Sequence, residues 1–180
     1  IPLRLVGSEM CIRDSYRAKV ETQTREDRFI AWCKEQFPKK NYEKSNFILQ
    51  GLRGVKDPEE IAHIQQACDI TEKGFKRVLG FVKPGVWEFE IEAVFAHEFL
   101  RNRSKGFAYT PIIASGANSN VLHYIENSQQ CQAGELILMD VGAEYGNYSS
   151  DMTRTIPVSG RFTPRQRAVY EAVLKVKDEA

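Results

Sequence analysis

The segment Leu136–Ile156 constrains the fold of this chain more than any other, because it places two carboxylates in a strand pattern. An apolar run of Leu, Ile, Met and Val contains Asp140, turn-forming residues gather at 145–147, and the returning strand carries Asp151. Burying a carboxylate in such a run is costly unless a cation or a dense set of hydrogen bonds compensates for the lost water. The segment therefore predicts a hairpin in which two acidic side chains approach a metal ion.

Two registers of this hairpin direct both carboxylates to the same face of the sheet. If the turn centres between Tyr145 and Gly146, Asp140 and Asp151 lie directly opposite each other, with Cβ atoms ~4.5–5.5 Å apart. If the turn centres on Gly146-Asn147, they are diagonal neighbours at ~7–8 Å. A slip by one residue would place them on opposite faces. A divalent cation would reverse the repulsion between them, whereas the alternative is an edge hairpin with two solvated aspartates.

Length, composition and charge exclude several classes of protein. The 180 residues suffice for one domain, or for one domain and part of another, and 42% hydrophobic with 27% charged residues is ordinary for a soluble globular protein. A net charge of +1 argues against a nucleic-acid partner held by phosphate contacts. No apolar run reaches the ~18–20 residues of a membrane span. The four cysteines form no C-x-x-C pair, which favours reduced thiols in a cytoplasmic protein.

Helix and strand signals become clear from Asp57 onward. Asp57-Pro58-Glu59-Glu60 predicts a helix start, and a second helix is expected from about Glu88 to Arg103. The second helix should bury four apolar residues, namely Phe89, Val94, Phe95 and Phe99. Short strands are expected at 111–114 and 120–124, and a last helix should begin at Thr163-Pro164. The expected fold class is α+β, with two helices on one face of a mainly antiparallel sheet and the site on the other.

The domain organisation is expected to have three parts. Residues 1–15 show no periodicity and are left unassigned, since an artefactual origin fits them. Residues 16–52 are interpreted as the tail of an N-terminal domain and a linker, with one amphipathic helix from Arg25 to Phe37. Residues 53–180 are expected to form a domain that is truncated, because the last helix runs to Ala180 without a C-cap.

Several short motifs occur in an order that resembles the pita-bread metallopeptidases. They are Lys56–Ile61, Tyr109–Ile113, Ser115–Asn118, Leu122–Tyr124, Asp140–Tyr145 and Tyr148–Thr155. Xaa-Pro aminopeptidase (aminopeptidase P) is the nearest member in pattern, prolidase is next, and creatinase and methionine aminopeptidase are more distant. The resemblance runs from about Arg53 to Val176 and implies that residues 53–180 are the N-terminal half of a pita-bread catalytic domain.

The resemblance also implies a dinuclear metal site. Two divalent ions, manganese first with cobalt or zinc as alternatives, would be bound by two Asp, one His and two Glu. Asp140 would bind one ion and Asp151 would bridge both, whereas His123, expected in the strand before the hairpin, would contact the substrate. Tyr109 resembles a family tyrosine near the site and is expected to bind substrate. From strand parity, the hydroxyl of Thr153 would orient Asp151 or have only a packing role.

The implied activity is removal of the N-terminal residue from peptides with proline in second position. A hydroxide shared by both metal ions would attack the carbonyl, and His123 would stabilise the charge that develops. The His and Glu ligands belong to a second half that this sequence does not contain, so we expect the chain alone to be inactive.

The alternatives are a prolidase that cuts Xaa-Pro dipeptides, a non-catalytic pita-bread binding module, and a hairpin stabilised by Ca²⁺ or Mg²⁺. A peptide is the expected partner, nucleic acid and membrane are not, and a homo-oligomer of the parent enzyme stays open.

Overall fold

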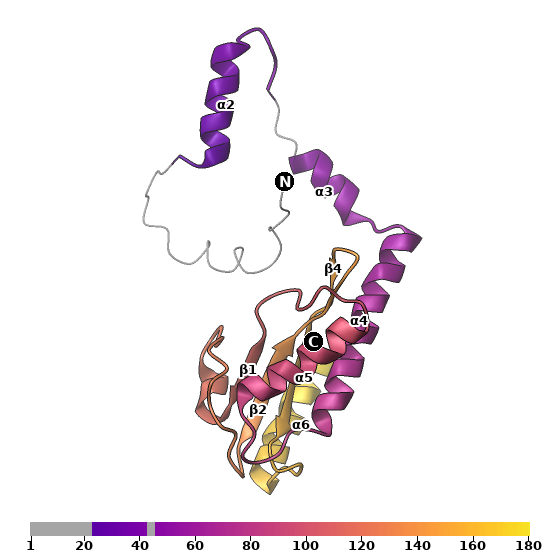
Figure 1. The fold of residues 1–180 in the computed structure, drawn as a ribbon, viewed down its shortest axis with the longest axis vertical. Helices are drawn as coiled ribbons and strands as arrows, with labels where there is room; N and C mark the ends of the chain where they lie inside the picture. Colours follow the sequence, from indigo (N-terminus) through magenta and orange to yellow (C-terminus); the bar gives the residue numbers. More distant parts are fainter. Residues whose placement is uncertain (1–22, 43–45) are drawn as a thin grey trace. The chain divides into compact units, whose positions relative to one another are not determined.

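The computed structural model of the protein describes residues 23–42 and 46–180 (Figure 1). The chain divides into two compact units, with the boundary between Lys56 and Asp57. The first unit contains helices α2 (Arg25–Gln36) and α3 (Asn46–Gly54). Helix α2 confirms the helix predicted from Arg25 to Phe37, and Thr24 caps it by accepting a hydrogen bond from the Asp27 backbone. Residues 1–15 lie outside the described part of the chain.

The second unit begins with two helices that pack against each other, α4 (Pro58–Leu79) and α5 (Glu88–Arg101). Asp57 caps α4 as predicted, and its capping box with Glu60 satisfies two backbone donors. Helix α5 also starts where the sequence indicates, but it ends two residues before Arg103.

One face of α5 supplies much of the core. Ile91, Phe95 and Phe99 are fully buried and follow helical spacing. The prediction that Phe89 is buried is wrong, because it is 52% exposed and stacks on Trp87. Phe89 precedes Ile91 by two positions, which is roughly 200° around the helix and therefore the opposite side. Val94 is only partly buried.

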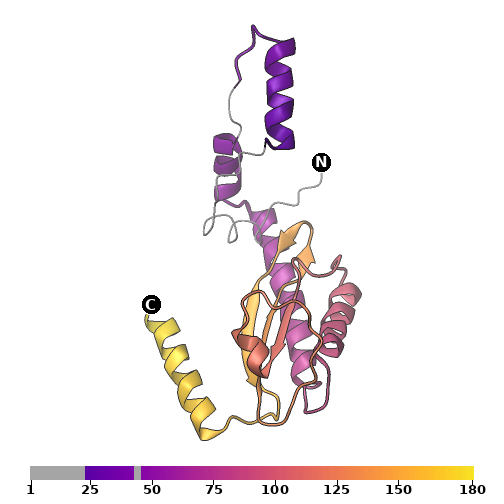
Figure 2. The same cartoon turned by 90° about the vertical axis from the view of Figure 1, so that its left-hand side faces the viewer.

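A three-stranded antiparallel sheet lies against these helices, with the order β1-β2-β5. Its strands are β1 (Ile112–Ser115), β2 (Leu136–Val141) and β5 (Met152–Pro157). Between β2 and β5 the hairpin continues as the two-stranded ribbon β3 (Glu144–Tyr145) and β4 (Tyr148–Ser149). Helices and sheet together confirm the α+β fold class, and Figures 1 and 2 show β1, β2 and β5 side by side with α4 and α5 along them.

The hairpin adopts the second of the two registers considered from sequence. Tyr145 pairs with Tyr148, and Asp140 pairs with Thr153. The two turn residues, Gly146 and Asn147, have φ angles of 60° and 67°, as a two-residue type I′ turn requires. Asp140 and Asp151 are therefore diagonal neighbours on one face.

The two faces of the sheet differ in burial. Ile137, Met139 and Val141 alternate toward the helices and are fully buried. Asp140 points to the opposite face and is half-buried, and Asp151 is exposed. The expectation that Asp140 lies in a fully buried strand is thus corrected: only one face of the strand is buried.

The second short strand predicted at 120–124 does not form. Residues Gly116–Asn120 form a 3-10 helix, η1, and a turn follows at 122–123. His123 has a φ of 54°, which no strand residue adopts, so its expected place in a strand is wrong. Side-chain hydrogen bonds take the place of strand pairing here: the hydroxyl of Ser119 donates to the carbonyl of Gly116, and polar side chains of this kind favour turns.

Helix α6 (Pro164–Glu179) confirms the helix expected from Thr163-Pro164, and Thr163 caps it. None of its residues is buried, and Figure 2 shows it standing apart from the sheet. Among the described residues, no helix is long and apolar enough to cross a membrane.

Candidate metal centre

Tyr109, Asp140 and Asp151 meet at the outer face of the hairpin. The Tyr109 hydroxyl oxygen lies 2.7 Å from Oδ1 of Asp140 and 3.0 Å from Oδ1 of Asp151. A hydroxyl has one hydrogen, so it donates to one carboxylate at a time while both stay within reach. The two carboxylates therefore converge on one point, as the sequence predicted.

The environment of Tyr109 keeps this hydroxyl protonated. Burial, followed by the hydrogen bonds and charges of Asp140 and Asp151, raises the pKa of Tyr109 far above its ordinary value. The phenol is consequently a hydrogen-bond donor to the carboxylates across the physiological pH range.

Backbone contacts around Gly142 bring Tyr109 to the carboxylates. The Ala108 N–H donates to the carbonyl of Gly142 at 2.8 Å, and Phe107 forms a bridge with Ala143. A Cβ on Gly142 would lie 1.9 Å from the Ser150 carbonyl oxygen and 3.0 Å from Cε1 of Tyr109. Glycine is therefore required here for close approach, a role for which the sequence offers no local signal.

Helix α4 holds the hairpin from the side opposite to the carboxylates. Ser150 precedes Asp151 and is buried, and its Oγ lies 2.6 Å from Oγ1 of Thr71. Both oxygens lie 2.9 Å from the Ala143 backbone nitrogen. Strand parity places Ser150 on the helix side, but nothing in the sequence indicates that Thr71 is its partner.

A cavity of about 320 Å³ brings the other expected residues to the same face. Residues 119–123 border it on one side and the sheet on the other, and its lining includes His123, Asp140 and Thr153. Thr153 lies opposite Asp140 in the sheet register, and within the described residues its side chain makes no hydrogen bond to Asp151. Its role in orienting Asp151 stays a prediction.

The donor set fits part of a site for a divalent cation. Carboxylate oxygens are ligands for hard divalent ions, and two carboxylates directed at one point repel each other unless a cation lies between them. In the two described ranges, however, no group of three or more His, Cys, Asp or Glu residues is placed to hold a metal ion. Asp140 and Asp151 therefore need further ligands from elsewhere to hold a metal ion tightly.

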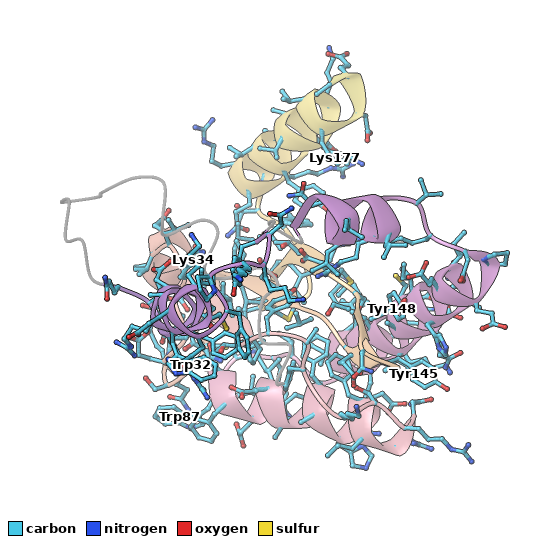
Figure 3. The ribbon with its side chains drawn as sticks, turned by 90° about the horizontal axis from the view of Figure 1, so that it is seen from above. Trp32, Lys34, Trp87, Tyr145, Tyr148 and Lys177 are labelled. Carbon is cyan, nitrogen blue, oxygen red and sulfur yellow. The ribbon has the colours of Figure 1, made fainter. Side chains whose placement is uncertain are left out.

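A second histidine, His63, packs against the tip of the hairpin rather than at this point. His63 on α4 stacks on Tyr148 with ring centroids 5.8 Å apart, at the tip of the hairpin. Figure 3 labels Tyr145 and Tyr148, which lie close together there. His63 packs against both tyrosine rings.

Comparisons with known proteins identify relatives of this chain. Residues 62–180 match the model of metallopeptidase family M24. The chain is 41% identical over 133 residues to an Xaa-Pro aminopeptidase of Haemophilus influenzae, a match that covers 74% of this chain and 31% of that protein. The chain thus spans about a third of the length of that curated relative.

Solved structures show the same arrangement of elements. The proline aminopeptidase P II of Yersinia pestis superimposes with a TM-score of 0.81 at 33% identity, over 91% of this chain and 39% of that one. A zinc-substituted aminopeptidase P of Escherichia coli in complex with product gives a TM-score of 0.79 at 34% identity, over 89% and 38% of the two chains.

Proposed function

The chain belongs to metallopeptidase family M24 and has its pita-bread fold, and we propose that it is the first half of the catalytic domain of an Xaa-Pro aminopeptidase. The parent enzyme would remove the N-terminal residue from peptides with proline in second position. The observation that carries the proposal is the convergence of Asp140 and Asp151 on the Tyr109 hydroxyl, in a chain 41% identical to an enzyme of that name.

Each residue of the site has a distinct part in this proposal. Asp140 would bind one metal ion and Asp151 would be shared between two, with manganese as the first choice. Bound there, the metal ions would supply a nucleophile from water at neutral pH and polarise the peptide carbonyl. Tyr109 would bind substrate, and its hydroxyl would also orient the two carboxylates. His123 would donate a hydrogen bond to the carbonyl oxygen as negative charge develops on it.

The cytoplasm is the compartment that we propose for this activity. The three cysteines in the described part of the chain, Cys33, Cys68 and Cys131, are free. Burial raises the pKa of the Cys131 thiol to about 11, so it is protonated and unreactive at neutral pH. Free thiols persist where cellular reductants keep them reduced.

Substitution of Asp140 in the parent protein tests the proposal. Asp140→Asn keeps the size of the side chain but removes the charge, so we expect bound manganese to fall and kcat/KM on an Xaa-Pro-Xaa tripeptide to drop by roughly 100-fold or more. The measurements are metal content by elemental analysis and steady-state hydrolysis of the tripeptide.

Asp69→Asn is the matched control, because Asp69 is also half-buried and accepts one side-chain hydrogen bond, but lies on α4. It should leave both metal content and turnover unchanged. Hydrolysis of Xaa-Pro dipeptides alone would instead assign the parent to prolidase. Full turnover by Asp140→Asn would contradict the proposed metal site.

A further inference from the structure

Glu88 is a fully buried carboxylate that the site described above does not use. It is the first residue of α5 and has no exposed surface. Its Oε1 accepts hydrogen bonds from the backbone N–H and the hydroxyl of Ser115, both at 2.7 Å, and from Nδ2 of Asn118 at 3.4 Å. Its Oε2 accepts from the Tyr124 hydroxyl at 2.7 Å and from the Gln129 backbone N–H at 2.9 Å.

All five donors belong to the segment 115–129, which contains His123. Burial of a carboxylate is costly unless hydrogen bonds replace its water, and the N-terminus of a helix favours negative charge. The donors that stabilise Glu88 therefore also tie this segment to the start of α5 at four residues along its length.

His123 lies between two of these anchored places. Asn118 is five residues before it, and Tyr124 follows it directly. His123 itself is exposed, and its neighbour Leu122 is 86% exposed, so packing of these two side chains does not hold the turn. The φ of 54° at His123 is a left-handed conformation that persists in a non-glycine residue only when its surroundings impose it.

Tyr124 connects Glu88 to the turn that contains His123. Its side chain is 8% exposed and its hydroxyl donates to Glu88. Burial, followed by this hydrogen bond, raises the pKa of Tyr124, so the hydroxyl keeps the proton that it donates. The residue next to His123 is thus fixed in the core while His123 lines the cavity that contains Asp140.

We propose that Glu88 is a positioning residue, whose carboxylate holds the segment 115–129 so that His123 faces the Asp140 side of the shared cavity. The catalytic consequence rests on the proposed function, in which His123 contacts the substrate. The position of His123 can be measured without any activity.

Histidine NMR of the 180-residue chain tests the proposal. The chain has three histidines, so its ¹H–¹³C spectrum should contain three imidazole Cε1 signals, and His123→Gln assigns one of them. In Glu88→Gln an N–H₂ group replaces one accepting oxygen and opposes the donors of this network. We expect the His123 signal to shift or broaden, whereas those of His63 and His97 stay in place.

Glu98→Gln is the matched control, because Glu98 is also a buried carboxylate of α5 but bonds to Arg77 and Asn102 rather than to the segment. It should lower stability without moving the His123 signal. An unchanged His123 signal in Glu88→Gln, or an equal change in Glu98→Gln, would overturn the proposal.

Tyr124→Phe is the second variant if Glu88→Gln does not fold, because it removes a single donor. It should shift the same signal by less, and no shift would count against the proposal.

In the parent enzyme, Glu88→Gln should lower kcat by roughly tenfold with metal content unchanged, since His123 would be displaced as a hydrogen-bond donor. If the parent hydrolyses no Xaa-Pro peptide while the His123 signal still moves, the proposed function fails and the positioning role of Glu88 stands.

Discussion

At the scale of one residue, the candidate site depends on Gly142, because glycine has no Cβ atom. The two strands of the hairpin and the Tyr109 ring approach its α-carbon so closely that a Cβ would overlap the Ser150 carbonyl oxygen at 1.9 Å. That neighbour is backbone and cannot rotate away. The two carboxylates can therefore reach the same hydroxyl only while residue 142 has no side chain.

We expect Gly142→Ala to lower the free energy of unfolding by about 2–3 kcal/mol, as overpacking against a fixed neighbour does. Urea denaturation of the 180-residue chain measures the change. Gly80→Ala is the control, because its Cβ would lie at an ordinary 3.6 Å from the Arg77 carbonyl oxygen, and its effect should stay within about 0.5 kcal/mol. Equal stability of the two variants would show that the hairpin opens at little cost.

At the scale of elements, the pairing of α4 with α5 includes a charged contact besides its apolar core. Glu98 on α5 is 9% exposed and accepts hydrogen bonds from Nη1 of Arg77 at 3.0 Å and from Nδ2 of Asn102 at 2.9 Å. Desolvation raises the pKa of Glu98, but these hydrogen bonds, with the charges of Arg101 and Arg77, outweigh it. The pKa of Glu98 consequently lies below its ordinary value.

This direction of shift predicts a pH-dependent effect of Glu98→Gln on stability. A carboxylate whose pKa is lower in the folded state stabilises the fold above its unfolded value of 4.5, and this contribution is lost as the pH falls through the folded value. We expect the variant to be less stable by about 1–2 kcal/mol at pH 7, with the difference shrinking at pH 3. Urea denaturation at both pH values measures it.

Glu72→Gln provides the comparison for this pair. Glu72 forms an ion pair with Lys76 at 2.6 Å, but its side chain is 61% exposed. Exposed pairs contribute roughly 0–1 kcal/mol, so this substitution should have little effect at either pH. If the loss of stability caused by Glu98→Gln grew toward acidic pH, the lowered pKa assigned to Glu98 would be refuted.

At the scale of the whole molecule, the second unit carries two carboxylates of the site, and the described residues offer no group of three ligands. We expect the 180-residue chain to bind manganese weakly, because two carboxylates leave most of the coordination shell of a divalent ion to water. Isothermal titration calorimetry measures the affinity and the number of ions, with Asp140→Asn as the control that should abolish the remaining binding. Tight binding of two ions would contradict this prediction and the expected inactivity of the chain alone.

Local features of the fold were predictable from the residues themselves. The capping box at Asp57 and the helix start at Thr163 form as expected, and the turn at Gly146-Asn147 is one of the two positions considered. Caps and tight turns depend on residues three or four positions apart, so the sequence contains the whole interaction. The strand expected at 120–124 does not form, because its apolar residues pair with no strand. The hydroxyls of Ser115 and Tyr124 instead donate hydrogen bonds to Glu88.

The sequence by itself therefore determined the α+β class, the hairpin that carries Asp140 and Asp151, and the family motifs, whereas the register of the hairpin came from the structure. Only the tertiary structure decided which hydrogen-bond donors contact the polar groups of the site. Tyr109 lies between the two carboxylates, 31 and 42 residues away in sequence, and Thr71 lies beside Ser150, 79 residues away. Such partners are selected when helices and strands pack and buried polar groups must be satisfied. A single sequence does not indicate which residues become these partners, because any of its many polar side chains could have supplied the donor.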